Sequence, residues 1–166
     1  MDELVTVLSR ERHALEHWLF RLLEARAAMA DERRGFLAWA AADLEAAALA
    51  VVVASEDRAL VAGADSLRAL VGAAHEPFST LLDEHRRELF RLAAEAKTAT
   101  RTTRRLATAG RAGIVDNPDG AGADHEDETP VALDDGLDGA IAVAGYDAVL
   151  HATAEVRLAG LVAFLD

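Results

Sequence analysis

The chain has 166 residues, a formal net charge of −12 at pH 7 and no cysteine. The length favours one domain, the absence of cysteine excludes disulfides and thiolate metal sites, and the negative charge argues against nucleic acid, whose phosphates bind clustered positive charge. Alanine accounts for 38 residues, which favours long, thin helices because alanine forms helices well but buries little apolar area.

The first two predicted helices span residues 3–29 and 36–62. In the first, apolar residues recur at a spacing close to 3.5 and charged residues fill most other positions, which is typical of a helix that packs along another. The charged run 31–35 ends in glycine and predicts the turn between the two helices, and Gly63 is expected to end the second. The expected core residues are Leu8, Leu15, Leu22, Leu44 and Val51.

A short helix and a long one complete the predicted body. Ser66 is expected to cap a helix over residues 67–71 that Gly72 stops. Pro77 suits the first turn of the last helix, where its missing N–H costs no hydrogen bond. Two glycines are expected to end this helix, Gly110 and Gly113, and its expected core residues are Leu81, Leu89 and Leu92. Three long helices and one short one predict an all-α, elongated antiparallel bundle.

The composition changes after residue 112. Residues 1–112 carry 16 basic and 17 acidic side chains, whereas residues 113–166 carry 12 acidic side chains and one basic one. Residues 113–139 combine high charge with low hydrophobicity, which is typical of a flexible linker. Residues 140–166 regain apolar content and have the periodicity of a weakly amphipathic helix. We therefore expect a helical body, an acidic linker, and a C-terminal apolar segment that binds a client or folds back on the body.

Histidines offer the main candidates for chemistry. His13-Ala-Leu-Glu-His17 fits the H-x-x-E-H pattern, which on a helix places two imidazoles one turn apart beside a carboxylate, as zinc requires. A catalytic site also needs a third ligand and a sheltered cavity, so two surface or boundary histidines are the favoured interpretation. His85 takes a core-facing position; packing against the bundle is favoured over a metal site shared with His13 and His17. The acidic run 124–128 lacks the ligand spacing of a calcium loop.

No catalytic residue, metal site or cofactor is therefore predicted. The N-terminus lacks the basic start and apolar run of a secretory signal. The most apolar windows, 46–54 and 141–150, are too short or too interrupted to span a bilayer. We expect a cytoplasmic protein without stable membrane insertion.

Short motifs follow one another along the body in a defined order: Arg10-Glu11-Arg12, Leu15-Glu16, Trp18–Glu24, Ser66–Leu70, Glu76-Pro77-Phe78, Leu81-Leu82, Glu84-His85-Arg86 and Leu89. Over residues 8–112 their order and spacing resemble those of FlgN-type flagellar export chaperones of the actinobacterial kind. That family carries an R-E-R start, then S-L-x-x-L, E-P-W, L-L and E-H-R. The acidic linker and the end of the chain match it poorly.

The resemblance implies a protein without enzymatic activity. Such chaperones bind hook–filament junction proteins of the FlgK and FlgL type, prevent their premature assembly and deliver them to the flagellar type III export gate. A helix-in-groove contact would shield the apolar faces of a client's terminal helices. We place the client contact in the C-terminal segment, at Tyr146, Leu150, Val156, Leu158, Leu161, Phe164 and Leu165. Two alternatives stay open: a helical adaptor or structural coiled-coil protein with another client, and a metal-dependent hydrolase.

Overall fold

The computed structural model describes residues 1–30, 34–116 and 135–166. These ranges contain helices and the turns between them, and no strand, which confirms the predicted all-α class. The helices are α1 (Asp2–Ala30), α2 (Arg34–Ala62), α3 (Leu67–Ala73), α4 (Phe78–Asp116), α5 (Asp135–Glu155) and α6 (Leu158–Leu165).

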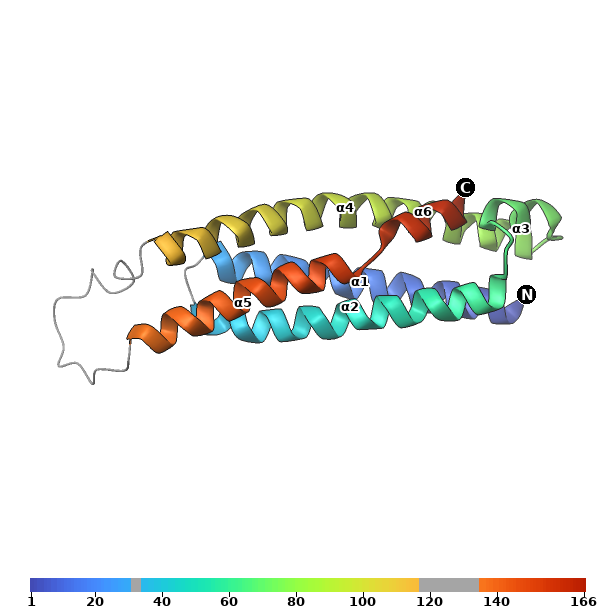
Figure 1. Cartoon of the computed structure of the whole chain (residues 1–166). Coiled ribbons are helices and arrows are strands. Elements are labelled where there is room, and N and C mark those ends of the chain that lie inside the picture. Colours follow the sequence, from blue (N-terminus) through green and yellow to red (C-terminus); the bar gives the residue numbers. More distant parts are fainter. Residues whose placement is uncertain (31–33, 117–134) are drawn as a thin grey trace.

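Four long helices run side by side along the molecule (Figure 1). α1 packs against α2 and α4, and α5 packs against the same two helices, so the four close into a ring. The short helix α3 packs against α4, and α6 packs against α4 and α3. Both termini lie toward the end of the bundle that carries α3 (Figure 1). The C-terminal segment, expected either to bind a client or to fold back, is folded back here.

The ends of α2 and α3 follow local sequence signals. Gly63 adopts a φ of 66° directly after α2, a left-handed conformation that glycine reaches at no steric cost. The Ser66 side chain accepts a hydrogen bond from the backbone N–H of Ala69, which caps α3 as predicted. Gly72 was expected to stop this helix, but it lies inside α3, which ends at Ala73.

The C-terminal end of α4 differs from the prediction. The helix continues through Gly110 and Gly113, both expected to end it, and stops at Asp116. A Cβ on Gly110 would lie 2.5 Å from the ring of Tyr146 in α5. Glycine therefore serves at this position to let two helices approach closely. At the start of α5, residues 135–139 are helical although they fall within the expected linker; residues 117–134 lie outside the described part.

The core is built from the predicted leucines with one exception. Leu8, Leu15, Leu22, Leu44, Val51, Leu89 and Leu92 are buried, as expected. Leu81 is 37% exposed, so its prediction is wrong, and the adjacent Leu82 is fully buried in its place. Two adjacent leucines are ambiguous because both lie near the apolar face, and neighbouring positions are separated by about 100° around a helix. α5 adds mainly small side chains to the core, together with Tyr146 and Val149.

Two stretches of the described chain are long and apolar enough to cross a membrane, judged by length and composition alone: Phe36–Ala62 and Gly139–Leu165. In this structure both pack within the bundle, and core helices of other bundles meet the same criterion. About a third of each stretch is buried, so much of α2 faces outward. The absence of membrane insertion stays a prediction.

Candidate functional site

The seven C-terminal residues predicted to contact a client lie on the bundle in this structure. Tyr146 and Leu150 belong to α5, Val156 lies between α5 and α6, and the other four belong to α6. Four of the seven side chains are buried: Tyr146, Leu161, Phe164 and Leu165. The other three, Leu150, Val156 and Leu158, are half-buried and pack against the same core. The predicted site is therefore divided between a helix of the ring and a short helix outside it.

A buried ion pair lies beneath α6. Nε of Arg58 donates a hydrogen bond to Oε2 of Glu11 at 2.7 Å, and Nη2 donates to Oγ of Ser55 at 2.8 Å. The Phe164 ring of α6 covers the same guanidinium, whose Cζ lies 4.2 Å from the ring centroid. This distance is within the range of a cation–π contact. α6 is thus anchored on a cation that links α1 to α2.

Burial dominates the electrostatics of this pair. Glu11 is 1% exposed and Arg58 is 6% exposed. Burial raises the pKa of Glu11 above its usual range, although the charge of Arg58 and hydrogen bonds from Arg58 and Ser55 oppose the shift. Removing one partner of such a pair is strongly destabilising because the other charge stays buried without compensation.

A cleft of about 550 Å³ opens beside the ion pair, between α1, α2 and the connection from α5 to α6. We call it the α6 cleft. Its walls are mainly aliphatic, with the Glu11–Arg58 pair among them. The lining residues are Glu11, Leu15, Val51, Val52, Ser55, Glu56, Arg58 and Ala59 from the bundle, and Val156, Arg157, Leu158, Gly160 and Leu161 from the C-terminal segment. Apolar walls around a fixed charged group suit the binding of an amphipathic helix.

Local interactions hold α6 only weakly. Its first residue follows Arg157, whose side chain makes no capping hydrogen bond. A helix of eight residues is marginal by itself, because nucleation is unfavourable and its terminal N–H groups need partners. The position of α6 therefore depends on the burial of Leu161, Phe164 and Leu165 against the bundle.

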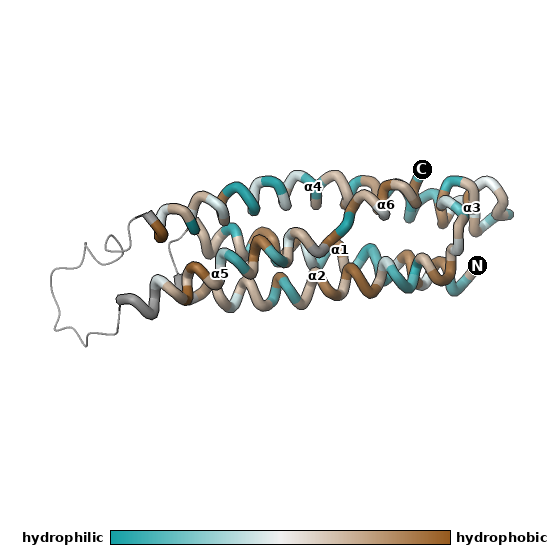
Figure 2. Tube along the Cα trace, viewed as in Figure 1, coloured by the Kyte–Doolittle hydropathy of each residue, from teal (hydrophilic) through white to brown (hydrophobic). Residues whose placement is uncertain are grey.

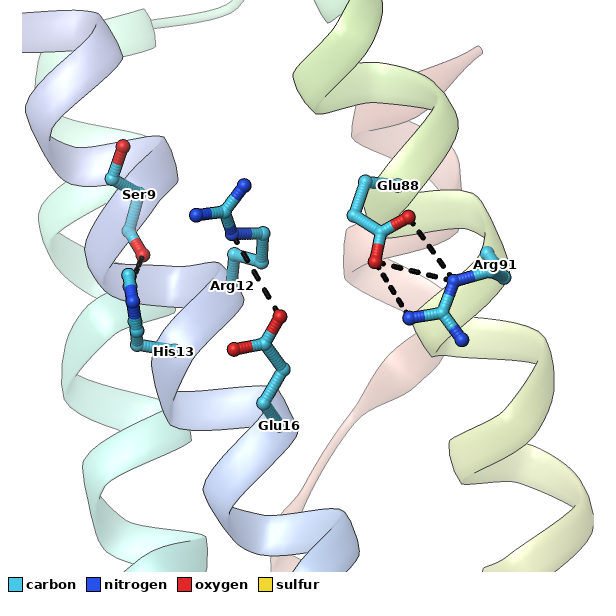
Figure 3. Close-up of polar contacts among 6 residues, drawn as sticks. All are labelled: Ser9, Arg12, His13, Glu16, Glu88 and Arg91. Atoms are coloured by element: carbon cyan, nitrogen blue, oxygen red, sulfur yellow. Dashed lines mark hydrogen bonds and ion pairs between the residues drawn. The ribbon is translucent and has the colours of Figure 1, made fainter.

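The H-x-x-E-H histidines lie on the exposed face of α1. The Nδ1–H of His13 donates to the carbonyl oxygen of Ser9 at 2.7 Å (Figure 3). Nε of Arg21 donates to Nε2 of His17 at 3.3 Å, so a cation lies against one of the two ring nitrogens through which His17 could bind a metal. Glu16 forms an ion pair with Arg12 at 3.8 Å. Within the described ranges, no three His, Cys, Asp or Glu side chains are grouped to hold a metal ion.

His85 is core-facing, as predicted, and is 6% exposed. Burial lowers its pKa below the usual range, the charge of Arg12 on α1 lowers it further, and Glu84 opposes the shift. On the same helix, Arg91 donates three hydrogen bonds to Glu88 (Figure 3). The acidic run 124–128 lies outside the described residues.

Sequence reasoning missed the Glu11–Arg58 pair, although its signal is visible. Glu11 continues the inward repeat of α1 between Leu8 and Leu15, and Arg58 lies in the inward register of α2 after Val51 and Ala54. Charged residues at the core-facing positions of two neighbouring helices indicate a buried pair. Comparisons of the chain with models of known protein families, with curated proteins and with solved structures find no match.

Proposed function

We propose that this protein is a cytoplasmic chaperone of flagellar type III export. It binds hook–filament junction proteins of the FlgK and FlgL type, prevents their premature assembly and delivers them to the export apparatus. It acts without catalysis, as an elongated antiparallel bundle with coiled-coil-like packing. The observation that carries the proposal is the position of α6, a short apolar helix without an N-terminal cap, seated over a buried cation beside an open cleft.

The proposed binding step is an exchange of helices. α6 presents Leu158, Leu161, Phe164 and Leu165 at spacings of three and four residues, which is the pattern of an amphipathic helix in a groove. A terminal helix of a junction protein with the same pattern would take its place, with an apolar or aromatic side chain over Arg58. Of the seven C-terminal residues, the five from Val156 onward then control access to the cleft, because contact with the bundle and exposure to a client exclude each other.

The tether of α6 also supplies a route to release. A segment joined to its own binding site competes at an effective concentration in the millimolar range. α6 therefore lowers the apparent affinity for the client and can return to the cleft when the client is drawn away. Such reversible binding suits a protein that must hand over its client.

α5 has a different part in this proposal. It packs between α2 and α4, Tyr146 contacts α4 at Gly110, and Asp147 pairs with Arg111 at 2.7 Å. We assign it to the permanent bundle. A helical adaptor with another client remains the alternative, because the same cleft would serve it. The hydrolase alternative is disfavoured by the Arg21 contact on His17.

The test is titration calorimetry with synthetic terminal helices of a junction protein from the same source. Because α6 competes for the cleft, a chain ending at Val156 should bind at least as tightly as the full chain, and circular dichroism should show that the bundle persists. Phe164→Ala, which removes the ring over Arg58, should change affinity in the same direction. Val162→Ala, on the exposed face of α6, is the matched control and should leave affinity unchanged.

Two results would contradict the proposal in different ways. Loss of binding in the shortened chain would show that the C-terminal segment itself contacts the client, which retains the chaperone but not the exchange. No binding by either chain, with the bundle intact in both, would contradict the chaperone function.

A further inference from the structure

The outward face of α2 is apolar along most of its length. Four large side chains on this face are strongly exposed: Trp39 (78%), Leu49 (64%), Val53 (48%) and Leu60 (84%). Ala42, Ala46 and Ala50 lie between them and are also exposed. These seven residues, which we call the α2 stripe, span about 31 Å at 1.5 Å per residue. Soluble monomers rarely expose a continuous apolar surface of this size without a partner for it.

The opposite face of α2 already forms the core. Leu37, Ala41, Leu44, Ala48 and Val51 are buried there, where α2 packs on α1 and α5. The helix is therefore apolar on both sides, which is why hydrophobic colouring recurs along it in Figure 2. The bundle uses one face and leaves the other uncovered.

Two shallow grooves flank Leu49, so the surface of the stripe is not flat. One, of about 470 Å³, lies between α1 and α2 and includes Ala46, Leu49, Ala50 and Val53. The other, of about 300 Å³, lies between α2 and α5 and includes Leu49 and Val52. Leu49 thus forms a ridge between two depressions, and the alanines allow close approach. Side chains of a docked helix fit such a surface as ridges into grooves.

Carboxylates border the stripe on both sides. At 100° per residue around the helix, Asp43 and Asp57 lie along one edge of the stripe and Glu45 and Glu56 along the other. Asp43 pairs with Arg21 at 3.1 Å. The other three carboxylates have no ion-pair partner among the described residues, although Arg10 lines the same groove as Asp57. The apolar surface is thus framed mainly by negative charge.

The negative charge around the stripe decides which kind of partner can bind there. A parallel pairing of two copies would bring opposite edges together, with Asp43 near Glu45 and Asp57 near Glu56 of the other copy. An antiparallel pairing centred near Ala50 would bring each edge against itself, with Asp43 near Asp57 and Glu45 near Glu56 of the other copy. Like charges in such positions are destabilising. An anionic bilayer would be repelled for the same reason. A helix that carries basic residues on both sides of its own apolar face can cover the α2 stripe and pair with the bordering carboxylates at the same time.

We propose that the α2 stripe docks an amphipathic helix of a second protein, whose apolar face is flanked on both sides by Lys or Arg. Trp39 and Leu60 contact its two ends and Leu49 its centre. The surface is separate from the α6 cleft, which shares none of the seven stripe residues. Glu56 borders both surfaces, but the inference does not depend on the proposed chaperone activity.

The chain carries its own reporter for this contact. It has two tryptophans; Trp18 is fully buried and Trp39 is 78% exposed. The probe is a synthetic helix of about 21 residues, matched to the stripe at 1.5 Å per residue, with leucine on one face and lysine on both flanks. Docking should shift Trp39 emission to shorter wavelength, and Trp39→Phe should abolish the shift. A peptide with glutamate flanks should give no shift, and added salt should weaken binding of the lysine peptide.

Matched variants locate the contact. Leu49→Ser should weaken binding of the lysine peptide about tenfold or more, as expected for a central anchor. Leu106→Ser, at an exposed leucine on α4, should change it less than about twofold, with helicity unchanged in both variants. Equal losses in the two variants, equal response to both peptides, or no response would overturn the proposal. So would a dimer in sedimentation equilibrium that Leu49→Ser dissociates, or a Trp39 shift produced by phosphatidylglycerol vesicles and not by the peptide.

Discussion

α5 and α6 come from the same apolar stretch of the chain but meet the bundle in different ways. α5 enters the ring through small residues: a Cβ on Gly145 would lie 3.0 Å from Leu37, and Gly110 accommodates Tyr146. α6 rests on the outside through three large side chains, one of them over a cation. α5 packs between α2 and α4 with its backbone close to both helices, whereas α6 rests on the bundle through large side chains. Two helices from one apolar stretch thus differ in the size of the residues through which they contact the bundle.

The largest effect should come from the ion pair that anchors α6. Arg58→Ala leaves Glu11 buried without its partner, so we expect a loss of about 3–5 kcal/mol in the free energy of unfolding. Urea denaturation measures it. Arg87→Ala, at a residue whose side chain is 75% exposed, should change the value by less than about 0.5 kcal/mol. Similar losses in both variants would show that the buried pair contributes no more to stability than an exposed ion pair does.

The close approach of α5 should be the next most sensitive point. Gly110→Ala places a methyl group against the Tyr146 ring, so the helices must separate, at an expected cost of about 1–3 kcal/mol. Gly113→Ala meets nothing within 4 Å and should be neutral or stabilising, because alanine favours the helix. Thermal denaturation of the two variants compares them directly. A stable Gly110→Ala protein would contradict the tight packing of α5.

In α6, replacing a glycine by alanine should stabilise the helix, the opposite of the effect expected at Gly110. Gly160→Ala meets no neighbouring atom within 4 Å, and alanine in a helix is favoured over glycine by about 1 kcal/mol. If α6 competes with the client as proposed, tighter docking should weaken client binding about fivefold, by the usual relation between free energy and affinity. Calorimetry with the junction-protein helix tests this. An unchanged affinity together with a more stable α6 would argue against competition.

The smallest effect is expected at His85 of α4, which supplies a reference outside α5 and α6. Its lowered pKa means that the folded state resists protonation, so its contribution to stability is present above about pH 6.5 and is lost as the pH falls through the folded value. The raised pKa of Glu11 has the opposite effect on stability, because its contribution is lost as the pH rises. We therefore expect wild type to lose stability relative to His85→Gln as the pH falls below about 6.5. If the stability of wild type and of His85→Gln changed in parallel with pH, His85 would not be the group responsible.

Local signals in the sequence were enough for part of the fold. The 3.5-residue repeat located α1, and the glycine and serine after α2 gave its end and the next cap, because these depend on the backbone of a few neighbouring residues. The end of α4 could not be predicted in this way. Gly110 has the composition of a helix end, but its role depends on Tyr146, which lies 36 positions further along the chain.

The candidate site was predictable to a similar degree. The apolar C-terminal residues stood out after an acidic linker, but their partition into a ring helix and an outer one depends on which side of each helix meets the bundle. Small residues hide this in α5, since Ala and Gly give weak amphipathicity. The α2 stripe was missed because periodicity identifies an apolar face only when the opposite face is polar.

Hydrogen exchange measured by mass spectrometry tests the central claim most directly, that α6 is exchangeable and α5 is not. In the free protein, amides of α6 should exchange faster than those of α5, since local opening is easier where fewer contacts are buried. Adding a terminal helix of a junction protein should remove protection from residues 158–165 and leave residues 140–154 unchanged. Loss of protection in both segments together, or a gain of protection in α6, would contradict the account.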